Sequence, residues 1–144
     1  MIVISQVELD DLEELSNLYE ELSGSKTDSG KMLENFKWMK SNPDYIVLGA
    51  KYGRKLVGTL MGIICHDIVG ACRPFMVIEN VVVDSRMRGK GVGKELLYKI
   101  EEMGRERNCY YTMFVSNAQR KEAHKFYESV GYSLDLVQGF KKYL

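Results

Sequence analysis

The most constraining feature of the sequence is a run of three glycines that alternate with other residues over positions 89–93. The preceding segment, 75–83, has the sequence FMVIENVVV and is rich in β-branched residues, which predicts a strand. The following segment has apolar residues at the spacing of one helix face. These residues are Val92, Leu96, Leu97, Ile100 and Met103. A strand, a Gly-rich loop and a helix are therefore predicted to follow one another in this part of the chain.

The remaining segments predict further strands and helices. Asp10 and Glu13 have capping-box spacing at the start of a helix, and Gly131 fits the position that follows a helix C-terminus. The predicted strands are 2–7, 45–52, 55–64, 75–83, 109–115, 132–135 and 140–144, and the predicted helices are 10–22, 29–40, 91–103 and 118–130. The order β-α-α-β-β-β-α-β-α-β predicts an α/β fold with a mixed central sheet flanked by about four helices.

Length and charge limit the classes of protein to which the chain can belong. Its 144 residues suit one domain, 1–144, and its 45% hydrophobic content is enough for a core without a metal or a disulfide. Twenty basic and twenty acidic residues give a formal net charge of zero, which argues against nucleic-acid binding over a broad surface. One local basic cluster remains at 86–94.

The cysteines and the N-terminal sequence predict a cytoplasmic protein. The three cysteines form no C-x-x-C pair, so we expect free thiols in a reducing compartment and no metal site. The first residues lack the basic start and the long apolar run of a signal peptide. No segment approaches the roughly 20 apolar residues of a membrane helix. We therefore expect a cytoplasmic chain that has no membrane partner.

The Gly-rich loop is suited to binding a polyphosphate. Glycines let backbone N–H groups approach an anion, and a helix N-terminus adds unpaired donors and partial positive charge. A P-loop is excluded because Gly89 and Gly93 are one residue too close and Glu95 replaces the magnesium-binding hydroxyl. A dinucleotide fingerprint is excluded because no third glycine follows Gly93 at the required spacing. The basic residues around the loop are Arg86, Arg88, Lys90 and Lys94.

Two motifs occur in the order and context of one known family. The first is R-x-x-G-x-G, formed by Arg88, Gly91 and Gly93 after the run 79–84, and the second is A-x-x-x-Y followed by G-Y, within 123–132. Together they resemble the motifs of the GNAT superfamily of N-acyltransferases. The resemblance covers about residues 2–144 in element order. The stretch IENVVVDSRMRGKGVGKELL is similar to that of glucosamine-6-phosphate N-acetyltransferases, but it lies in the cofactor half and says little about the acceptor.

The resemblance implies that acetyl-CoA is the cosubstrate. It places the pantetheine arm along the backbone of Val81, Val82 and Val83, as an added strand. It places the pyrophosphate on Arg88, Gly89, Lys90, Gly91, Val92, Gly93 and Lys94. Many members of the family carry an Asn seven residues before the motif tyrosine, where this chain has Arg120. Either Arg120 or Asn117, ten residues before Tyr127, is therefore the candidate for a further cofactor contact.

Acyl transfer to an amine requires a group that removes the amine proton, a donor that polarises the thioester carbonyl and an acid for the departing sulfur. No Ser-His-Asp or Cys-His constellation is visible, so we expect direct attack by the amine. The resemblance assigns the acid to Tyr127, for which a core aromatic residue is the alternative role. Glu79 lies within an apolar strand, where a carboxylate needs a partner or a function. It is the candidate base, acting directly or through water, and a salt bridge or a sheet-edge position is the alternative.

The resemblance also implies where the acceptor lies. The first two helices and their loop border the acceptor site in this family, and Tyr19, Glu20 and Trp38 would suit a cationic amine there. The acceptor is then a small-molecule amine or an exposed protein amine. Members of the family often form homodimers, to which the closing strands 132–135 and 140–144 could contribute.

Two other classes of function compete with an enzyme. A non-catalytic acyl-CoA binding module would need the Gly-rich loop but neither Glu79 nor Tyr127. The presence of both residues favours the enzyme. A nucleic-acid binder that uses the cluster 86–94 conflicts with the zero net charge, and no aromatic platform stands beside the cluster.

Overall fold

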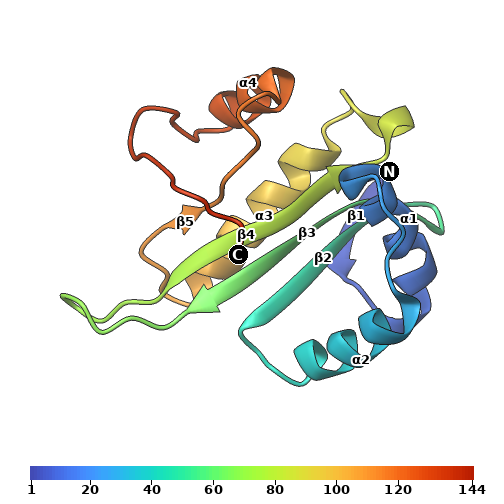
Figure 1. Ribbon diagram of the computed structural model, residues 1–144, viewed down its shortest axis with the longest axis horizontal. Coiled ribbons are helices and arrows are strands. Elements are labelled where there is room, and N and C mark those ends of the chain that lie inside the picture. The colour runs from blue at the N-terminus through green and yellow to red at the C-terminus, as the bar shows by residue number, and fades with distance from the viewer. The chain divides into compact units, whose positions relative to one another are not determined.

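The computed structural model describes residues 1–144, in two units, Met1–Met113 and Phe114–Leu144. The first unit is built on a five-stranded sheet in the order β1-β2-β3-β4-β5 (Figure 1). The first four strands are antiparallel to their neighbours, and β5 is parallel to β4. The strands are β1 Ile2–Gln6, β2 Tyr45–Tyr52, β3 Lys55–Cys65, β4 Phe75–Val83 and β5 Thr112–Met113.

Three of the four α-helices belong to the first unit, and the fourth belongs to the second. They are α1 Leu12–Ser23, α2 Ser29–Lys40, α3 Val92–Glu106 and α4 Lys121–Ser129, with short 3-10 turns at Leu9–Asp11 and Ser85–Met87. The side chain of Asp28 caps α2 by accepting a hydrogen bond from the N–H of Lys31 at 3.0 Å. No helix has both the length and the apolar character that crossing a membrane requires.

The start of α1 differs from the predicted capping box of Asp10 and Glu13. The N–H of Glu8 instead donates to the carboxylate of Asp11 at 2.9 Å, and the chain makes a 3-10 turn before α1 begins at Leu12. Asp11 is buried and forms an ion pair with Lys51 at 2.6 Å. The capping box is therefore formed by Glu8 and Asp11, two residues before the predicted pair.

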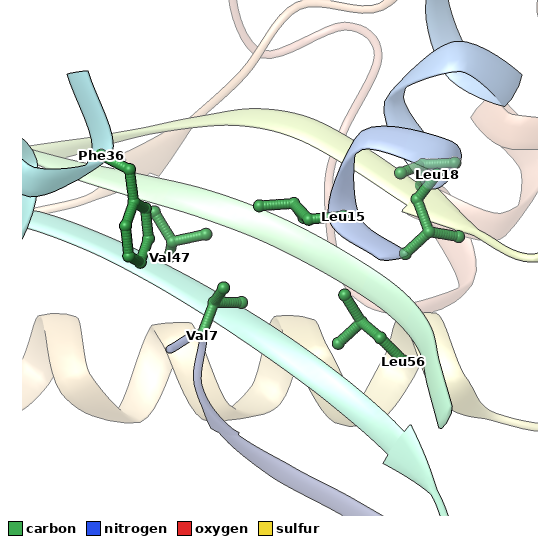
Figure 2. Packing of buried hydrophobic residues seen from close by; sticks show 7 residues of the cluster. Val7, Leu15, Leu18, Phe36, Val47 and Leu56 are labelled. Atoms are coloured by element: carbon green, nitrogen blue, oxygen red, sulfur yellow. The ribbon is translucent and has the colours of Figure 1, made fainter. Parts of the chain in front are cut away.

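Helices α1 and α2 cover one face of the sheet. Figure 2 shows side chains of both helices pointing onto the strands, with α3 on the other side of the sheet. The buried cluster on the α1–α2 face consists of Val7, Leu15, Leu18, Phe36, Val47, Leu56 and Val82. Leu15 and Leu18 come from α1 and Phe36 comes from α2, so both predicted helices bury apolar residues against the sheet.

Helix α3 packs closely against β3 because two glycines of that strand lack side chains. A Cβ built on Gly62 would lie 2.8 Å from Cδ1 and 2.9 Å from Cγ1 of Ile100, and one built on Gly58 would lie 2.9 Å from Cγ1 of Val92. Real Cβ atoms do not tolerate such distances without movement of their neighbours. Ile100, Val92 and the Leu96–Leu97 pair are all buried on this face. The approach of α3 fixes where its N-terminus lies relative to the end of β4.

The C-terminal third departs from the predicted strands. The predicted strand 109–115 is reduced to Thr112–Met113, because residues 109–111 bond individually to Gly104, Pro74 and Met76 and form no ladder. The predicted closing strands 132–135 and 140–144 are wrong, and so is the final β of the predicted order. A strand needs a hydrogen-bonded partner, and no segment pairs with either stretch. The predicted helix 118–130 begins later, at Lys121, because residues 117–120 form a turn.

The close packing of α3 yields a stability prediction. We expect Gly62→Ala to lower the free energy of unfolding by about 1–2 kcal/mol, because its methyl group overlaps Ile100 in a filled core. Urea titration followed by circular dichroism measures the change. Gly30→Ala, in α2, is the control, because the nearest atom to its Cβ is at an ordinary 3.6 Å. A loss of stability no larger than that of the control would contradict the packing.

Candidate active site

The Gly-rich loop has the backbone conformation that its glycines predict. Gly89 and Gly91 have φ of 75° and 84°, in the left-handed region that favours glycine. Gly91 is also the residue that precedes α3, whose first N–H groups have no partner within the helix. A Cβ built on either glycine meets nothing within 4 Å, so the space beside the loop is open. Open space beside unpaired N–H donors fits a phosphate group.

The four basic side chains of the loop are not equivalent. Arg86 is paired with Asp84 at 2.8 Å. Arg88 donates from Nε to the carbonyl of Val83 at 3.2 Å and forms a longer contact with Glu21 at 3.4 Å. Lys90 forms no ion pair, and Lys94 lies over the ring of Tyr98 at 5.5 Å. Lys90, Lys94 and the remaining donors of Arg88 are therefore the charges available to an anion.

Asp84 fixes the point at which β4 ends and the loop begins. Its buried carboxylate accepts hydrogen bonds from the N–H of Arg86 at 2.9 Å and from Nε and Nη2 of Arg86 at 3.1 and 2.8 Å. The N–H of Asp84 donates to the carbonyl of Val57 at 2.8 Å. The Arg86 side chain and backbone hold the pKa of Asp84 well below its usual range, with a smaller contribution from Lys55.

A β-bulge interrupts β4 at Glu79-Asn80. Between the pair Met61–Glu79 and the pair Thr59–Val82, β3 advances by two residues and β4 by three. Asn80 has φ of 57°, a left-handed conformation that a non-glycine residue seldom adopts. The extra residue changes which face the later side chains of β4 occupy.

The other edge of β4 is open over its second half. Strand β5 pairs only with Met76 and Val77, and beyond Val77 no strand of the first unit pairs with β4 on this side. Val81, Val82 and Val83 lie on this open stretch, immediately before the loop. Their backbone can therefore hydrogen-bond an extended ligand, as a neighbouring strand would.

Glu79 is exposed at the bulge, and its side chain forms no hydrogen bond or ion pair. The salt-bridge alternative for this residue is therefore wrong, and the sheet-edge alternative fits its position. The apolar residues that flank Glu79 in the sequence do not enclose its side chain, because the bulge turns this part of β4 to the surface. An unpaired carboxylate beside the open edge has both oxygens available to accept a proton.

The second unit holds Tyr127 and Asn117. Tyr127 is buried, its ring lies 4.5 Å from that of Phe114, and burial raises the pKa of its phenol. The hydroxyl forms no hydrogen bond. The side-chain oxygen of Asn117 accepts a hydrogen bond from the N–H of Gln119 at 3.0 Å, which leaves its amide NH₂ group free. Gly131, with φ of 101°, ends α4 as predicted.

The predicted acceptor residues have different environments. The Tyr19 hydroxyl is hydrogen-bonded to Thr59, and burial raises the pKa of Tyr19 to about 12. It is therefore part of the packing of α1 on the sheet. Trp38 is 57% exposed on α2, and its ring meets that of Tyr45 edge-on at 5.3 Å. Glu20 is exposed on α1.

The sequence did not single out two carboxylates that shape the loop. Asp84 has a local signal, because it follows three valines directly and precedes a basic segment. Glu21 has none, since it lies 64 residues before Ser85, whose N–H it binds. Only the packing of α1 on the sheet brings Glu21 to the loop.

Comparison with known proteins identifies the family. The chain belongs to the acetyltransferase (GNAT) family, whose model matches residues 9–132. This match confirms the family predicted from the two motifs. It spans most of the first unit and extends through α4 of the second.

Two individual relatives are named as N-acetyltransferases, which agrees with the family match. A probable glucosamine 6-phosphate N-acetyltransferase of Drosophila melanogaster is 31% identical over 104 residues, which are 71% of this chain and 46% of that protein. An aminoalkylphosphonate N-acetyltransferase of Salmonella typhimurium is 38% identical over 55 residues, which are 38% of this chain and 36% of that protein. The chain thus spans less than half the length of these two relatives.

A solved structure matches along the whole chain. The glucosamine-6-phosphate N-acetyltransferase of Arabidopsis thaliana is 26% identical, with a TM-score of 0.85 over 99% of both chains. The predicted mixed α/β fold is therefore confirmed, apart from its last strand.

The Asp84 cluster yields a pH-dependent prediction. We expect Asp84→Asn to lower the free energy of unfolding by about 1–2 kcal/mol at pH 7, because several hydrogen bonds to a charged group are weakened. The folded-state pKa of Asp84 lies below the unfolded value of about 3.9, so its contribution is present above pH 4 and is lost as the pH falls further. In urea titrations, the difference in the free energy of unfolding between wild type and variant should therefore narrow as the pH falls below about 4. A gap that is constant with pH would refute this role.

Proposed function

We propose that the protein is an acetyl-CoA-dependent N-acyltransferase that moves an acetyl group to a primary amine. One observation carries the proposal: the open edge of β4 runs directly into the Gly-rich loop and the N-terminus of α3. The extended pantetheine arm of acetyl-CoA needs a strand edge such as that of β4. Its pyrophosphate needs the loop and the helix N-terminus that follow directly after this edge. Membership in the acetyltransferase family supports the same donor. We propose that the whole chain, 1–144, acts as one domain.

The donor site follows from the loop and strand. Backbone groups of Val81, Val82 and Val83 pair with the pantetheine arm. The N–H groups from Gly89 to Lys94 bind the pyrophosphate, with Arg88, Lys90 and Lys94 supplying positive charge. The free side-chain amide NH₂ of Asn117 is the candidate for a further donor to the cofactor. We propose no metal in this reaction.

The chemistry is a direct transfer. The amine nitrogen attacks the thioester carbon, so that a C–N bond forms and the C–S bond breaks. The proton lost by the amine passes to Glu79, directly or through water, and the departing sulfur receives a proton from Tyr127. The Tyr127 phenol, whose pKa is raised by burial, carries a proton at neutral pH that it can donate. The exposed, unpaired carboxylate of Glu79 supports its role as an acceptor.

The acceptor is proposed to be a small-molecule amine in the cytoplasm. The relatives named above act, by their names, on glucosamine 6-phosphate and on aminoalkylphosphonates, both of which are amines that carry an acidic phosphorus group. The protonated amine of such an acceptor is a cation. Exposed Trp38 on α2 offers it an aromatic face, and exposed Glu20 on α1 offers it a carboxylate. A protein amine is the alternative acceptor that the assay below distinguishes.

The proposal is tested by acetyl transfer. Purified protein is incubated with acetyl-CoA and a panel of amines that includes amino sugars, amino sugar phosphates, aminophosphonates and a lysine peptide, and the release of free thiol is followed. We expect turnover with at least one small-molecule amine. Binding of acetyl-CoA without turnover on any amine would favour a non-catalytic acyl-CoA binding module. Turnover on the peptide alone would identify a protein acceptor, and the absence of binding would exclude both functions.

The assigned acid and base are tested with the same assay. We expect Glu79→Gln and Tyr127→Phe each to lower kcat by about 10²–10⁴-fold, the contribution typical of a positioned acid or base, while the affinity for acetyl-CoA is unchanged. Glu13→Gln, on the exposed side of α1, is the matched control. A variant that retains the full rate is not the acid or base proposed for it.

We also propose that the protein forms a homodimer. Five apolar residues near the C-terminus are exposed, more than a small solvent-facing segment usually carries. They are Leu136, Val137, Phe140, Tyr143 and Leu144. Sedimentation of the wild type should give twice the mass of the chain, and Phe140→Ser together with Val137→Ser should shift it towards the monomer. A monomeric wild type at high concentration would contradict the dimer.

A further inference from the structure

The side chain of Glu21, near the end of α1, contacts the segment that leads into the Gly-rich loop, although the two are distant in the sequence. Its Oε1 accepts a hydrogen bond from the N–H of Ser85 at 2.9 Å and a longer one from Nη2 of Arg88 at 3.4 Å. Ser85 is the first residue of the 3-10 turn that leads from β4 into the Gly-rich loop. One carboxylate oxygen therefore contacts both the backbone and the motif arginine of the loop.

Two carboxylates bind different groups at the start of the loop. Asp84 binds the N–H and the side chain of Arg86, and Glu21 binds the N–H of Ser85 and the side chain of Arg88. Consecutive N–H groups are thus bound by side chains from different elements, and the loop cannot rotate about this segment without breaking one of the bonds. Asp84 comes from the loop itself, whereas Glu21 joins the loop to α1.

The negative charge of Glu21 could act in two opposite ways on an anion bound at the loop. It could fix the loop in the binding conformation, or it could compete with the anion for Arg88. The distances favour the first effect, because the bond to the backbone is short and the contact with Arg88 is long. The Arg88 side chain is also 61% exposed, so water and salt screen its attraction to Glu21.

We propose that Glu21 is a positioning residue for acetyl-CoA binding, which it supports by holding the Ser85 N–H and the Arg88 side chain in place. This inference rests on the proposed function, because it takes the loop as the binding site of the acetyl-CoA pyrophosphate. Glu21 contacts no reacting atom. Its removal should weaken the binding of the donor and leave the chemical step unchanged.

Two substitutions separate the hydrogen bond from the charge. Glu21→Ala removes both, and Glu21→Gln keeps an oxygen that can accept from Ser85. We expect Glu21→Ala to raise the KM for acetyl-CoA and the Kd for CoA about fivefold, with kcat and the KM for the amine unchanged. Glu21→Gln should remain within about twofold of the wild type, because its amide oxygen preserves the bond to the backbone. Glu13→Ala is the control on the same helix.

Calorimetric titration with CoA and steady-state kinetics give these quantities, and thermal unfolding checks that each variant is folded. Unchanged affinity in Glu21→Ala would overturn the positioning role. Tighter binding in both variants would overturn it as well and would identify Glu21 as a competitor for Arg88. Failure of the wild type to bind CoA would instead refute the proposed function, and the inference with it.

Discussion

The hydrogen bonds of Asp84 are the constraint on which the candidate site depends. They fix the residue that follows β4 to β3 on one side and to the first turn of the loop on the other. Without them, the open edge of β4 and the unpaired N–H groups at the start of α3 would not be held next to each other. Burying a carboxylate is unfavourable unless it is fully hydrogen-bonded, and here the arginine two residues later in the sequence supplies most of the bonds. One basic residue of the loop is therefore structural rather than available to a ligand.

The packing of α3 against β3 adds a second constraint, which begins at the first residue of the helix, Val92. Gly58 and Gly62 let the helix approach β3 so closely that any side chain there would displace it. A helix that moved outwards would carry its N-terminus away from the end of β4. Two glycines in a buried strand thus affect the position of a loop some thirty residues later in the sequence.

Local features of the sequence were predictable, and features that need a distant partner were not. The strands 45–52 and 75–83 have the bounds that their apolar residues predict, because both are buried within the sheet. Gly89 and Gly91 of the loop also have a positive φ, for which their pattern of alternating glycines is suited. The closing strands failed because an extended apolar pattern does not supply a partner, and the contact of Glu21 with Ser85 joins segments 64 residues apart. The bulge at Asn80 could not be predicted from the sequence for the same reason, since it is defined only by the register of β4 against β3.

The divergence of β5 from β4 after Val77 has a consequence for how the protein can change during evolution. A ligand arm that joins the sheet there is recognised by main-chain groups, which every amino acid carries. Substitutions along this edge alter the side chains but keep the same ladder of donors and acceptors. In the proposed function, donor recognition is thus insensitive to substitutions along this edge, whereas exposed side chains of α1 and α2, such as Glu20 and Trp38, can change to admit other amines. One scaffold can in this way keep its donor while its acceptors diversify.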